Sequence, residues 1–580
     1  MRTLRLEFCI LPNWVYIGLK AKRTSGIRNA IHHMVTWLGK KSLITVLACC
    51  AGLAGCGGGS GNSSPAVGNP DPISPNPPSG PGTTGNALNF PASDLYKDSC
   101  GAPRISTAQE SFPDLLGRFE DEAYWLRSWS YETYLWYDEI NYGDPEDIAP
   151  SAQGVADYFE TLVTLETTPA GNAKDRFHYA RDTAEYEAAS QQGISFGYGA
   201  SFRLISARPP RELVISLVEP SSPAAIAGMR RGTRILADDG EDLINGTDVD
   251  TLNSGLFPRQ NGEQHSFSVL DRGALQPRTV TMTSAQIRED PVPIARTIVT
   301  DSGNVGYLLF NRHILTAEQK LVDAVRSFRD QNITDLVVDL RYNGGGYLYI
   351  ANQLAYMIAG SGVAGQTFGS LEFNSKNPGT NPITGQALQP TAFRTTTVEA
   401  QPSGALLPTL NLPSSRVFVL TTGSTCSASE ALINGLRGVG VEVIQIGATT
   451  CGKPYGFYPQ DNCGTTYFTT QFRSVNALGF GDYPDGFSPA NSTETSFGVA
   501  LPGCQAAEDY SPLGSDEDPF LSAALRYRED PSICPEPAQA AGNAAGSSSV
   551  TDTATDRAGG TALRLLSPTL QDALIRPIEG

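Results

Sequence analysis

The chain has 580 residues, of which 40% are hydrophobic and 18% charged, and its formal net charge is −18. This length exceeds one ordinary hydrophobic core, so we expect two or three folded domains joined by linkers. The first 55 residues carry eight basic side chains and one acidic one, which leaves a formal charge of about −25 on the remainder. So acidic a body could not neutralise phosphates over a broad face, and this argues against a nucleic-acid partner.

The N-terminal segment has the features of an export signal. Lys40 and Lys41 precede an apolar run from Leu43 to Ala54, which is too short to span a bilayer. The run ends in L-A-G-C at Cys56 and resembles the bacterial lipoprotein box. The resemblance implies cleavage before Cys56 and lipidation of that cysteine. The alternative is an ordinary secretory signal with a chance cysteine, and in either case Met34 is a possible true start.

The residues that follow Cys56 are rich in Gly, Pro, Ser and Asn, as expected of a flexible tether at 56–95. Position 57 is Gly instead of the Asp that often retains lipoproteins at the inner membrane. For a Gram-negative host, the lipoprotein pattern therefore implies an anchor in the outer membrane that faces the periplasm.

Six cysteines remain after the signal and the lipidated cysteine are removed, and an even number in an exported chain indicates disulfides. Six cysteines allow 15 connectivities, so the sequence does not fix the pairs. A metal site is not expected, because the chain has no C-x-x-C pair and only three histidines remain after processing. No organic cofactor is implied either. The cysteines are Cys100, Cys426, Cys451, Cys463, Cys504 and Cys534, and the histidines are His178, His265 and His313.

The folded part begins near residue 96. Between Leu115 and Trp136, apolar and aromatic residues recur at helical spacing, which predicts a helical domain with an aromatic core at 96–188.

From 189 to 290 the pattern changes to short β-like runs broken by glycine. The stretch 218–236, V-E-P-S-S-P-A-A-I-A-G-M-R-R-G-T-R-I-L, resembles a conserved segment of PDZ domains, with Thr233 in place of the usual Asp. A short helix from Pro223 to Ala227 fits this spacing. The resemblance implies strand addition of a substrate C-terminus, with its carboxylate held by a glycine-rich loop. That loop would consist of Phe196, Gly197, Tyr198 and Gly199; the alternative is a spacer whose groove is closed.

The region 291–534 has a β-α-β order. We expect a strand at 304–310, an amphipathic helix at 317–331 and a buried strand at 335–340, which together indicate an α/β layer. The last strand leads into R-Y-N-G-G-G at 341–346. Glycines after a strand let bare backbone approach a substrate carbonyl, so the amide of Gly345 or Gly346 could face an oxyanion.

The segment 423–430, G-S-T-C-S-A-S-E, is followed 26 residues after Ser427 by Lys453 in C-G-K-P-Y-G. A serine hydroxyl needs a base to become a nucleophile, and a buried, neutral lysine can serve. This pair indicates Ser–Lys acyl transfer. The structural alternatives are a helix N-cap for Ser427 or its neighbour Ser429, and a surface turn for Lys453.

Together the D-L-R-x-N-G-G-G, S-A-S-E and G-K motifs resemble the carboxyl-terminal processing (tail-specific) proteases, peptidase family S41. The resemblance covers roughly 100–530 and implies an α/β ClpP/crotonase-like core at 291–534 behind the PDZ-like domain. It assigns Ser427 as nucleophile, Lys453 as base, and Ala428 with the glycine turn as oxyanion donors. Many family members carry Gln four residues after the lysine, where this chain has Phe457. Its replacement is open among Gln445, Glu430 and Gln471.

These features predict a multi-domain α/β protein that acts as an exported, lipid-anchored serine endopeptidase on protein substrates. The alternatives are a non-catalytic envelope protein that binds peptides or apolar ligands with the same fold, and a scaffold that regulates a partner. We expect loops over the active face at 360–412, and 476–486 is a candidate cleft lining. The segment 535–580 is expected to be a low-complexity tail. The oligomeric state is not predicted.

Overall fold

The computed structural model describes residues 90–535 apart from 108–109, 259 and 493–496, together with the backbone of three short strands. These strands are β1 (Cys9–Leu11), β2 (Trp14–Tyr16) and β29 (Ala573–Leu574). Cys56 and most of the predicted signal peptide, linker and tail lie outside the described residues. Within the described part of the chain, no helix combines the length and apolar character needed to cross a bilayer.

The chain divides into two compact units, residues 1–86 and 87–580. In the first unit, β1 and β2 pair as an antiparallel hairpin. The second unit holds all of the elements that follow.

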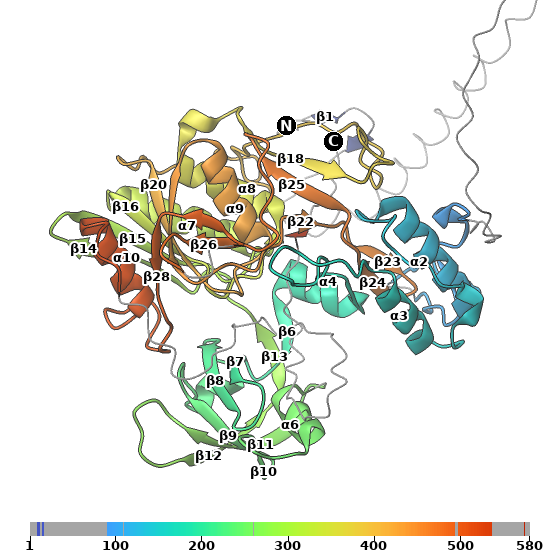
Figure 1. Ribbon diagram of the computed structural model, residues 1–580, viewed down its shortest axis with the longest axis horizontal. Helices are drawn as coiled ribbons and strands as arrows, with labels where there is room; N and C mark the ends of the chain where they lie inside the picture. Colours follow the sequence, from blue (N-terminus) through green and yellow to red (C-terminus); the bar gives the residue numbers. More distant parts are fainter. Residues whose placement is uncertain are drawn as a thin grey trace, which may run out of the picture. The chain divides into compact units, whose positions relative to one another are not determined.

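A helical region with an aromatic core opens the second unit, as the sequence predicted. Trp125 and Trp129 lie one turn apart on the first long helix, and their buried rings stack with centroids 5.0 Å apart. Ser151 caps the next helix, where its Oγ accepts a hydrogen bond from the Gly154 amide at 3.1 Å. The elements are η1 (Ser93–Leu95), β3 (Ser99–Cys100), β4 (Leu115–Leu116), α2 (Phe119–Thr133), η2 (Pro145–Asp147), α3 (Ala152–Thr161), β5 (Tyr179–Asp182) and α4 (Thr183–Gln192) (Figure 1).

The predicted β-rich region forms a sheet in the order β12-β11-β9-β8-β7, and β10 pairs with β9. Strand β7 therefore stands at one end of this sheet. Strands β6 and β13 pair separately at the two chain ends of the region. The elements are β6 (Ile194–Gly197), β7 (Ala200–Ser206), β8 (Glu212–Val218), α5 (Pro223–Ile226), β9 (Arg234–Asp238), β10 (Glu241–Asp242), α6 (Val249–Leu256), β11 (Gln264–Leu270), β12 (Arg278–Thr283) and β13 (Ala285–Arg288).

A six-stranded sheet in the order β14-β15-β16-β20-β21-β28 forms the centre of the third region. All neighbours are parallel except the edge pair of β14 and β15. This arrangement confirms the predicted α/β class. The strands are β14 (Ile294–Thr300), β15 (Gly303–Leu309), β16 (Asp335–Asp339), β20 (Arg416–Thr421), β21 (Glu442–Gly447) and β28 (Gly503–Gln505).

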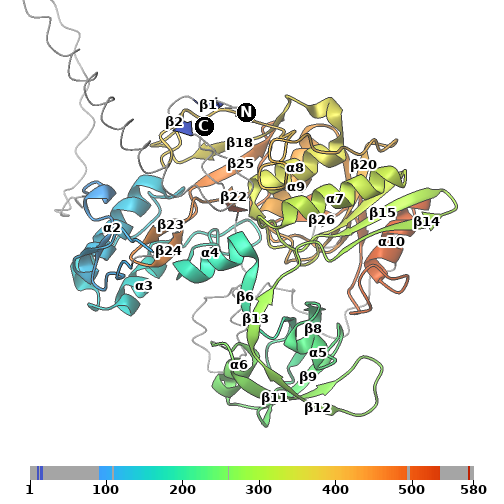
Figure 2. The ribbon, with the colours of Figure 1, turned by 180° about the vertical axis from the view of Figure 1, so that it is seen from behind.

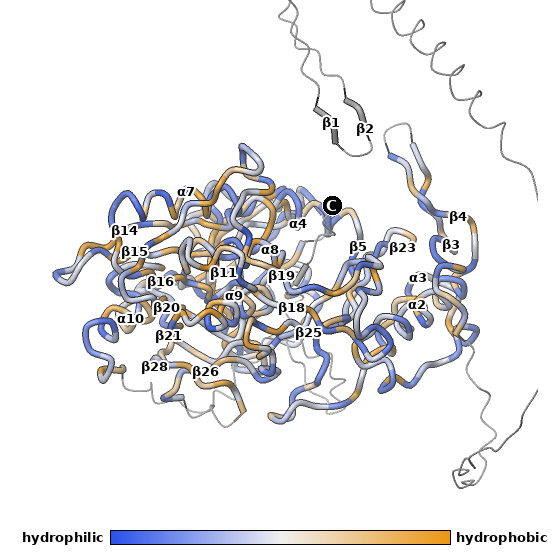
Figure 3. The backbone as a smooth tube through the Cα atoms, turned by 90° about the horizontal axis from the view of Figure 1, so that it is seen from above, coloured by the Kyte–Doolittle hydropathy of each residue, from blue (hydrophilic) through white to orange (hydrophobic). Residues whose placement is uncertain are grey.

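Helices cover both faces of this sheet. Successive side chains of a strand point to opposite faces, so they pack into two separate hydrophobic cores. Leu308 and Val338 pack with three helices, α7 (Ala317–Asp330), α8 (Leu348–Ala359) and α9 (Ala428–Gly438). Tyr307 and Val337 pack with α10 (Pro519–Glu529) on the opposite face. Figure 2 shows these helices from behind, with α7, α8 and α9 on one side of the sheet and α10 on the other. Figure 3 shows the apolar stretches along the central strands.

A second, smaller sheet has the order β19-β18-β25-β22. Strand β18 lies within 360–412, so the expectation of loops was wrong for its seven residues, which pair antiparallel with β25. The remaining elements are β17 (Gly346–Tyr347), η3 (Ser361–Val363), β18 (Thr367–Phe373), β19 (Thr391–Ala392), β22 (Tyr455–Gly456), β23 (Gln460–Asn462), β24 (Thr465–Phe468), β25 (Phe472–Asn476), β26 (Phe487–Pro489) and β27 (Val499–Leu501).

The six predicted cysteines form three disulfides, which confirms the interpretation of their even number. The pairs are Cys100–Cys463, Cys426–Cys451 and Cys504–Cys534. The first joins the helical region to the turn between β23 and β24. Strand β5 of the helical region pairs with β24 and completes a three-stranded sheet in the order β23-β24-β5. The helical region is thus bound to the third region by a covalent link and a strand pairing.

Candidate active site

The three sequence motifs meet at one edge of the central sheet. Strands β16, β20 and β21 are parallel neighbours, so their carboxyl ends lie together. The glycine turn 344–346 follows β16, Ser427 follows β20, and Lys453 follows β21. Crevices at the carboxyl ends of parallel strands are the usual ligand sites of such sheets. The topology therefore supplies the first condition for a joint site.

Ser427 stands at the amino end of α9 in an unusual backbone conformation. Its φ is 57° and its ψ −114°, a combination that costs a residue with a side chain about 1–3 kcal/mol. The serine is buried, and its Oγ has no hydrogen-bond partner among the described residues. A hydroxyl in this position also faces the positive end of the helix dipole, which favours developing negative charge. Strain and an unengaged hydroxyl together are typical of a nucleophile.

The glycine turn lies directly against Ser427. A Cβ on Gly345, whose φ is 111°, would approach the Ser427 Cβ to 2.8 Å and the Ala428 amide nitrogen to 3.0 Å. Only glycine fits such an approach. The Gly345 amide donates to Asn343 Oδ1 at 3.0 Å, so that donor is already engaged. Gly346 is the first residue of β17, which pairs with β29.

His313 and Asn343 support this turn, and sequence reasoning missed both. The His313 amide donates to the Gly345 carbonyl at 2.9 Å, and the Tyr347 amide donates to the His313 carbonyl at 2.8 Å. The His313 Nδ1 lies 3.0 Å from Asn343 Oδ1. Burial lowers the pKa of His313 to about 3, so its ring is neutral at pH 7. The only sequence signal was the place of Asn343 between the strand and the glycines.

Lys453 is almost fully buried, with 1% of its surface exposed. Its Nζ lies 4.4 Å from the ring centre of Phe457 and 4.9 Å from that of Phe177. Loss of hydration lowers the pKa of Lys453 to about 7, although the charges of Asp175 and Glu430 act in the opposite direction. A large share of this lysine is therefore neutral near pH 7, as a general base must be.

Phe457 occupies the position where Gln was expected, and its aromatic face flanks the lysine instead of a polar group. Of the three alternatives to that Gln, Gln445 donates through Nε2 to Thr421 Oγ1 at 2.9 Å. Gln471 accepts from the Tyr458 amide at 2.8 Å. Both glutamine side chains thus bond to Thr421 and Tyr458, and neither of these bonds is to Lys453. Glu430 is the alternative that contacts the lysine's own backbone.

Glu430 joins the nucleophile segment to the lysine segment. Its Oε2 accepts from the amides of Ser427 and Lys453, at 2.9 and 2.8 Å. Its Oε1 accepts from the Gly452 amide at 2.8 Å and from Thr450 Oγ1 at 2.6 Å. Burial raises the pKa of Glu430, and these four bonds partly offset that effect. In the sequence, Glu430 was one of three candidates to replace the family's Gln, and the structure places it in the first turn of α9.

The helical region contributes two residues next to the lysine that the sequence did not indicate. Asp175 accepts hydrogen bonds from the Tyr134 hydroxyl and the Phe177 amide, each at 2.9 Å. Phe177 places its ring beside Lys453, as noted above. Trp136 of the same region packs edge-on against Tyr455, with centroids 4.8 Å apart. These residues close the lysine pocket from a segment almost 300 residues away in the chain, and no motif marks them.

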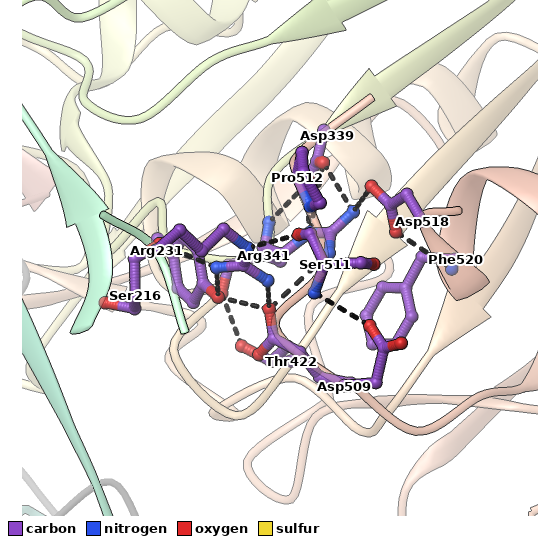
Figure 4. Close-up of polar contacts among 12 residues, drawn as sticks. Ser216, Arg231, Asp339, Arg341, Thr422, Asp509, Ser511, Pro512, Asp518 and Phe520 are labelled. Atoms are coloured by element: carbon purple, nitrogen blue, oxygen red, sulfur yellow. Dashed lines mark hydrogen bonds and ion pairs between the residues drawn. The ribbon is translucent and has the colours of Figure 1, made fainter. Parts of the chain in front are cut away.

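A buried ion network fixes the end of β16 just before the glycine turn (Figure 4). The Arg341 guanidinium has no exposed side-chain surface and contacts Asp339 at 2.8 Å and Asp518 at 2.7 Å. From the β-rich region, Arg231 donates to the Tyr342 hydroxyl at 2.5 Å and to the Ser511 carbonyl at 2.7 Å. The arginine of the D-L-R motif is thus a structural residue of this strand end.

The predicted peptide-binding loop comprises the last two residues of β6 and the two residues that join it to β7. Phe196 is exposed, whereas Tyr198 is buried and donates through its hydroxyl to the Gly255 carbonyl at 2.9 Å. Gly197 and Gly199 have φ values of 145° and 71°, which a side chain would disfavour. Of the four predicted residues, Tyr198 is therefore a core residue. Strand β7 touches the nucleophile's loop, where Arg203 donates to Ser424 Oγ at 2.9 Å.

Comparison with known proteins finds a family match over these motifs. Residues 304–457 match the model of peptidase family S41. A carboxyl-terminal-processing protease of Picosynechococcus sp. is 29% identical over 150 residues, which are 25% of this chain and 34% of that protein. The chloroplastic carboxyl-terminal-processing peptidase 2 of Arabidopsis thaliana is 26% identical over 163 residues, 27% of this chain and 30% of that protein. The chain thus spans about a third of the length of these curated relatives.

Among solved structures, that of a Bacteroides fragilis NCTC 9343 protein with an S41 protease designation has a TM-score of 0.52 and 24% identity. The match covers 72% of this chain and 98% of that one, and it shows a shared fold. The matched segment 304–457 includes the glycine turn, Ser427 and Lys453. The part of the chain that carries these motifs is therefore similar to peptidase family S41.

Proposed function

We propose that this protein is a serine endopeptidase in which Ser427 is the nucleophile and Lys453 the general base. The observation that carries the proposal is that one carboxylate, that of Glu430, accepts hydrogen bonds from the backbone amides of both residues. These bonds keep the two backbone segments next to each other. The depressed lysine pKa and the close glycine turn support it further.

In the proposed reaction, neutral Lys453 takes the Ser427 hydroxyl proton while Oγ attacks the scissile carbonyl. The amides of Ala428 and of the glycine turn at Gly345 and Gly346 are the proposed donors to the oxyanion that forms. The lysine then gives its proton to the leaving amine, and an acyl-enzyme remains on Ser427. Water, deprotonated by Lys453, hydrolyses the ester and releases the new carboxyl terminus. No metal or organic cofactor takes part in this scheme.

The first test is covalent labelling of the mature protein, without its lipid anchor, by a fluorophosphonate followed by mass spectrometry. We expect an adduct on Ser427 that is lost or strongly reduced in Lys453→Ala. Labelling of both proteins alike would argue against lysine activation. A folded protein that takes no label would favour the alternative of a peptide-binding protein.

The pH dependence of hydrolysis should follow the ionisation of Lys453. Only the neutral amine can accept the serine proton, so kcat/KM is expected to rise about tenfold per pH unit below pH 6 and to level off above pH 8. The midpoint should lie near 7. A profile that is flat between pH 5.5 and 8.5, measured with a quenched-fluorescence peptide, would contradict this assignment.

We further propose that residues 189–290 are a PDZ-like module that captures substrate C-termini. The position of β7 at the end of its sheet supports this, since strand addition requires such an edge. We expect a C-terminal peptide to bind more tightly than its amide in a fluorescence-anisotropy titration. Equal affinity would argue against carboxylate capture.

The sequence before residue 90 and the three disulfides support an envelope location, with a lipid anchor at Cys56. The mass of the mature N-terminal peptide tests this proposal. An acylated Cys56 is the expected result, and a free or absent cysteine would contradict it.

A further inference from the structure

We propose that the Cys426–Cys451 disulfide positions Ser427 and Lys453 relative to each other, because it joins the two loops that carry them by a covalent bond. This inference rests on the proposed function, because it concerns the geometry of that reaction. It assigns the two cysteines a positioning role in the proposed reaction.

The place of the bridge is the first argument. Cys426 immediately precedes Ser427, and Cys451 is separated from Lys453 by one glycine. The Cα atoms of the cysteines are 5.2 Å apart, within the ordinary range for a disulfide. Both cysteines are buried, with 0% and 9% of their surface exposed. The bond therefore joins the two loops at points one residue before Ser427 and two residues before Lys453.

The second argument is that both functional residues are held in unfavourable states. Ser427 has a positive φ, and the Lys453 amine has lost its hydration. Gly452, between Cys451 and Lys453, has a φ of 81°, so the segment that carries the base also has a backbone conformation that favours glycine. Without a restraint, the serine backbone could relax and the lysine could swing toward water.

The third argument is that the bridge lies beside Glu430 and that the backbone amides of both cysteines are hydrogen-bonded to neighbouring segments. The Cys451 Sγ lies 3.4 Å from Glu430 Oε2, the oxygen that accepts from the amides of Ser427 and Lys453. The Cys451 amide donates to the Thr425 carbonyl at 3.0 Å, and the Cys426 amide donates to the Asn343 carbonyl at 3.1 Å. The disulfide thus ties the serine loop, the lysine loop and the segment before the glycine turn into one unit.

The chain offers a matched control in Cys504–Cys534. The two bridges span similar sequence separations, 25 and 30 residues, so they should restrict the unfolded chain to a similar degree. Cys504 lies on the edge strand β28 and Cys534 follows α10, and both belong to the core on the α10 face of the sheet. Loss of this second bridge should therefore affect stability without disturbing the Ser–Lys pair.

The experiment compares the full mature chains of Cys426→Ala/Cys451→Ala and Cys504→Ala/Cys534→Ala with wild type. We expect the first variant to lose at least about tenfold in kcat with less than threefold change in KM. Labelling of Ser427 by the fluorophosphonate should slow by a similar factor. The midpoint of the pH profile should move upward as Lys453 gains contact with water. The control variant should keep kcat within about twofold, although the melting temperatures of both fall.

Equal activity of the two variants, or a loss that only follows the melting temperature, would overturn the proposal. If Cys426→Ala/Cys451→Ala does not fold, Cys426→Ala/Cys451→Val restores buried volume and takes its place. Should that also fail, folded wild-type protein is treated with a phosphine reductant, and mass mapping identifies which bridge has opened. Activity that persists after the 426–451 bridge opens then overturns the proposal.

The same comparison separates this inference from the proposed function. If Ser427→Ala is inactive but the 426–451 variant is fully active, only the positioning role is wrong. If Ser427→Ala is as active as wild type, the proposed function itself fails.

Discussion

Replacement of Ser427 by alanine is expected to reduce peptide hydrolysis at least about 1,000-fold, because no other group in the proposed reaction can form the acyl-enzyme. Substrate affinity should change little, since the hydroxyl has no hydrogen-bond partner among the described residues and contributes nothing visible to the fold. Release of positive-φ strain is not expected, because alanine is subject to the same backbone restriction. The melting temperature should therefore stay close to that of wild type.

Ser429→Ala is the matched control, since Ser429 is the rival serine of the same motif. Its Oγ donates to the Asn343 carbonyl at 3.0 Å, which indicates a structural role. We expect this variant to lose about 1 kcal/mol of stability and to keep activity within about tenfold of wild type. Assay with a quenched-fluorescence peptide decides between the two serines. An inactive Ser429→Ala beside an active Ser427→Ala would reverse the assignment.

Replacement of Lys453 by methionine should abolish hydrolysis and at the same time stabilise the folded protein by about 2–4 kcal/mol at pH 7.5. The stabilisation follows from the burial of an ionisable amine against Phe177 and Phe457, which lowers the pKa of Lys453 to about 7. In the unfolded chain a lysine titrates near 10.4. Between pH 7 and 10 the unfolded state therefore binds more protons than the folded state. Folding must release a proton from Lys453 in this range, which lowers the free energy of unfolding.

The sign of this effect makes the prediction specific. Wild-type stability should rise with pH between 7 and 10, whereas Lys453→Met should lack that rise. The gap between the two proteins should narrow toward pH 10 and close only above the unfolded pKa of about 10.4, where the amine is neutral in both states. Denaturant unfolding at pH 7, 8.5 and 10 measures the gap. Lys320→Met is the control, because Lys320 is exposed and pairs with Asp290 at 2.9 Å, and it should change stability by less than about 1 kcal/mol. A constant or widening gap would contradict the buried-base interpretation.

The β-α-β segment of the third region was predicted closely from sequence. The expected strand at 304–310, helix at 317–331 and strand at 335–340 correspond to 303–309, 317–330 and 335–339. These elements carry their own signals, because an amphipathic period or a fully apolar run reflects the burial of one face or of both. The strand β18 was missed because its region is dominated by turn-forming residues, and only its pairing with β25 makes it a strand.

At the site, the sequence indicated the residue types and their order, and the roles of Ser427 and Lys453 remain predictions that the experiments above test. The sequence could not identify what surrounds the lysine. Asp175 and Phe177 are distant in the chain, and Phe457 replaces the expected amide with a ring. Such contacts depend on how separate regions pack, and no local pattern encodes them.

By itself, the sequence determined the α/β class, the family motifs and the even set of cysteines, because each depends on composition or short-range spacing. Only the tertiary structure decided which cysteines pair, that Glu430 joins the serine and lysine loops, and that the Gly345 amide donates to Asn343. The physical reason is that these features depend on distances of a few ångströms between segments tens to hundreds of residues apart. Those distances are set by the packing of β16, β20 and β21 side by side.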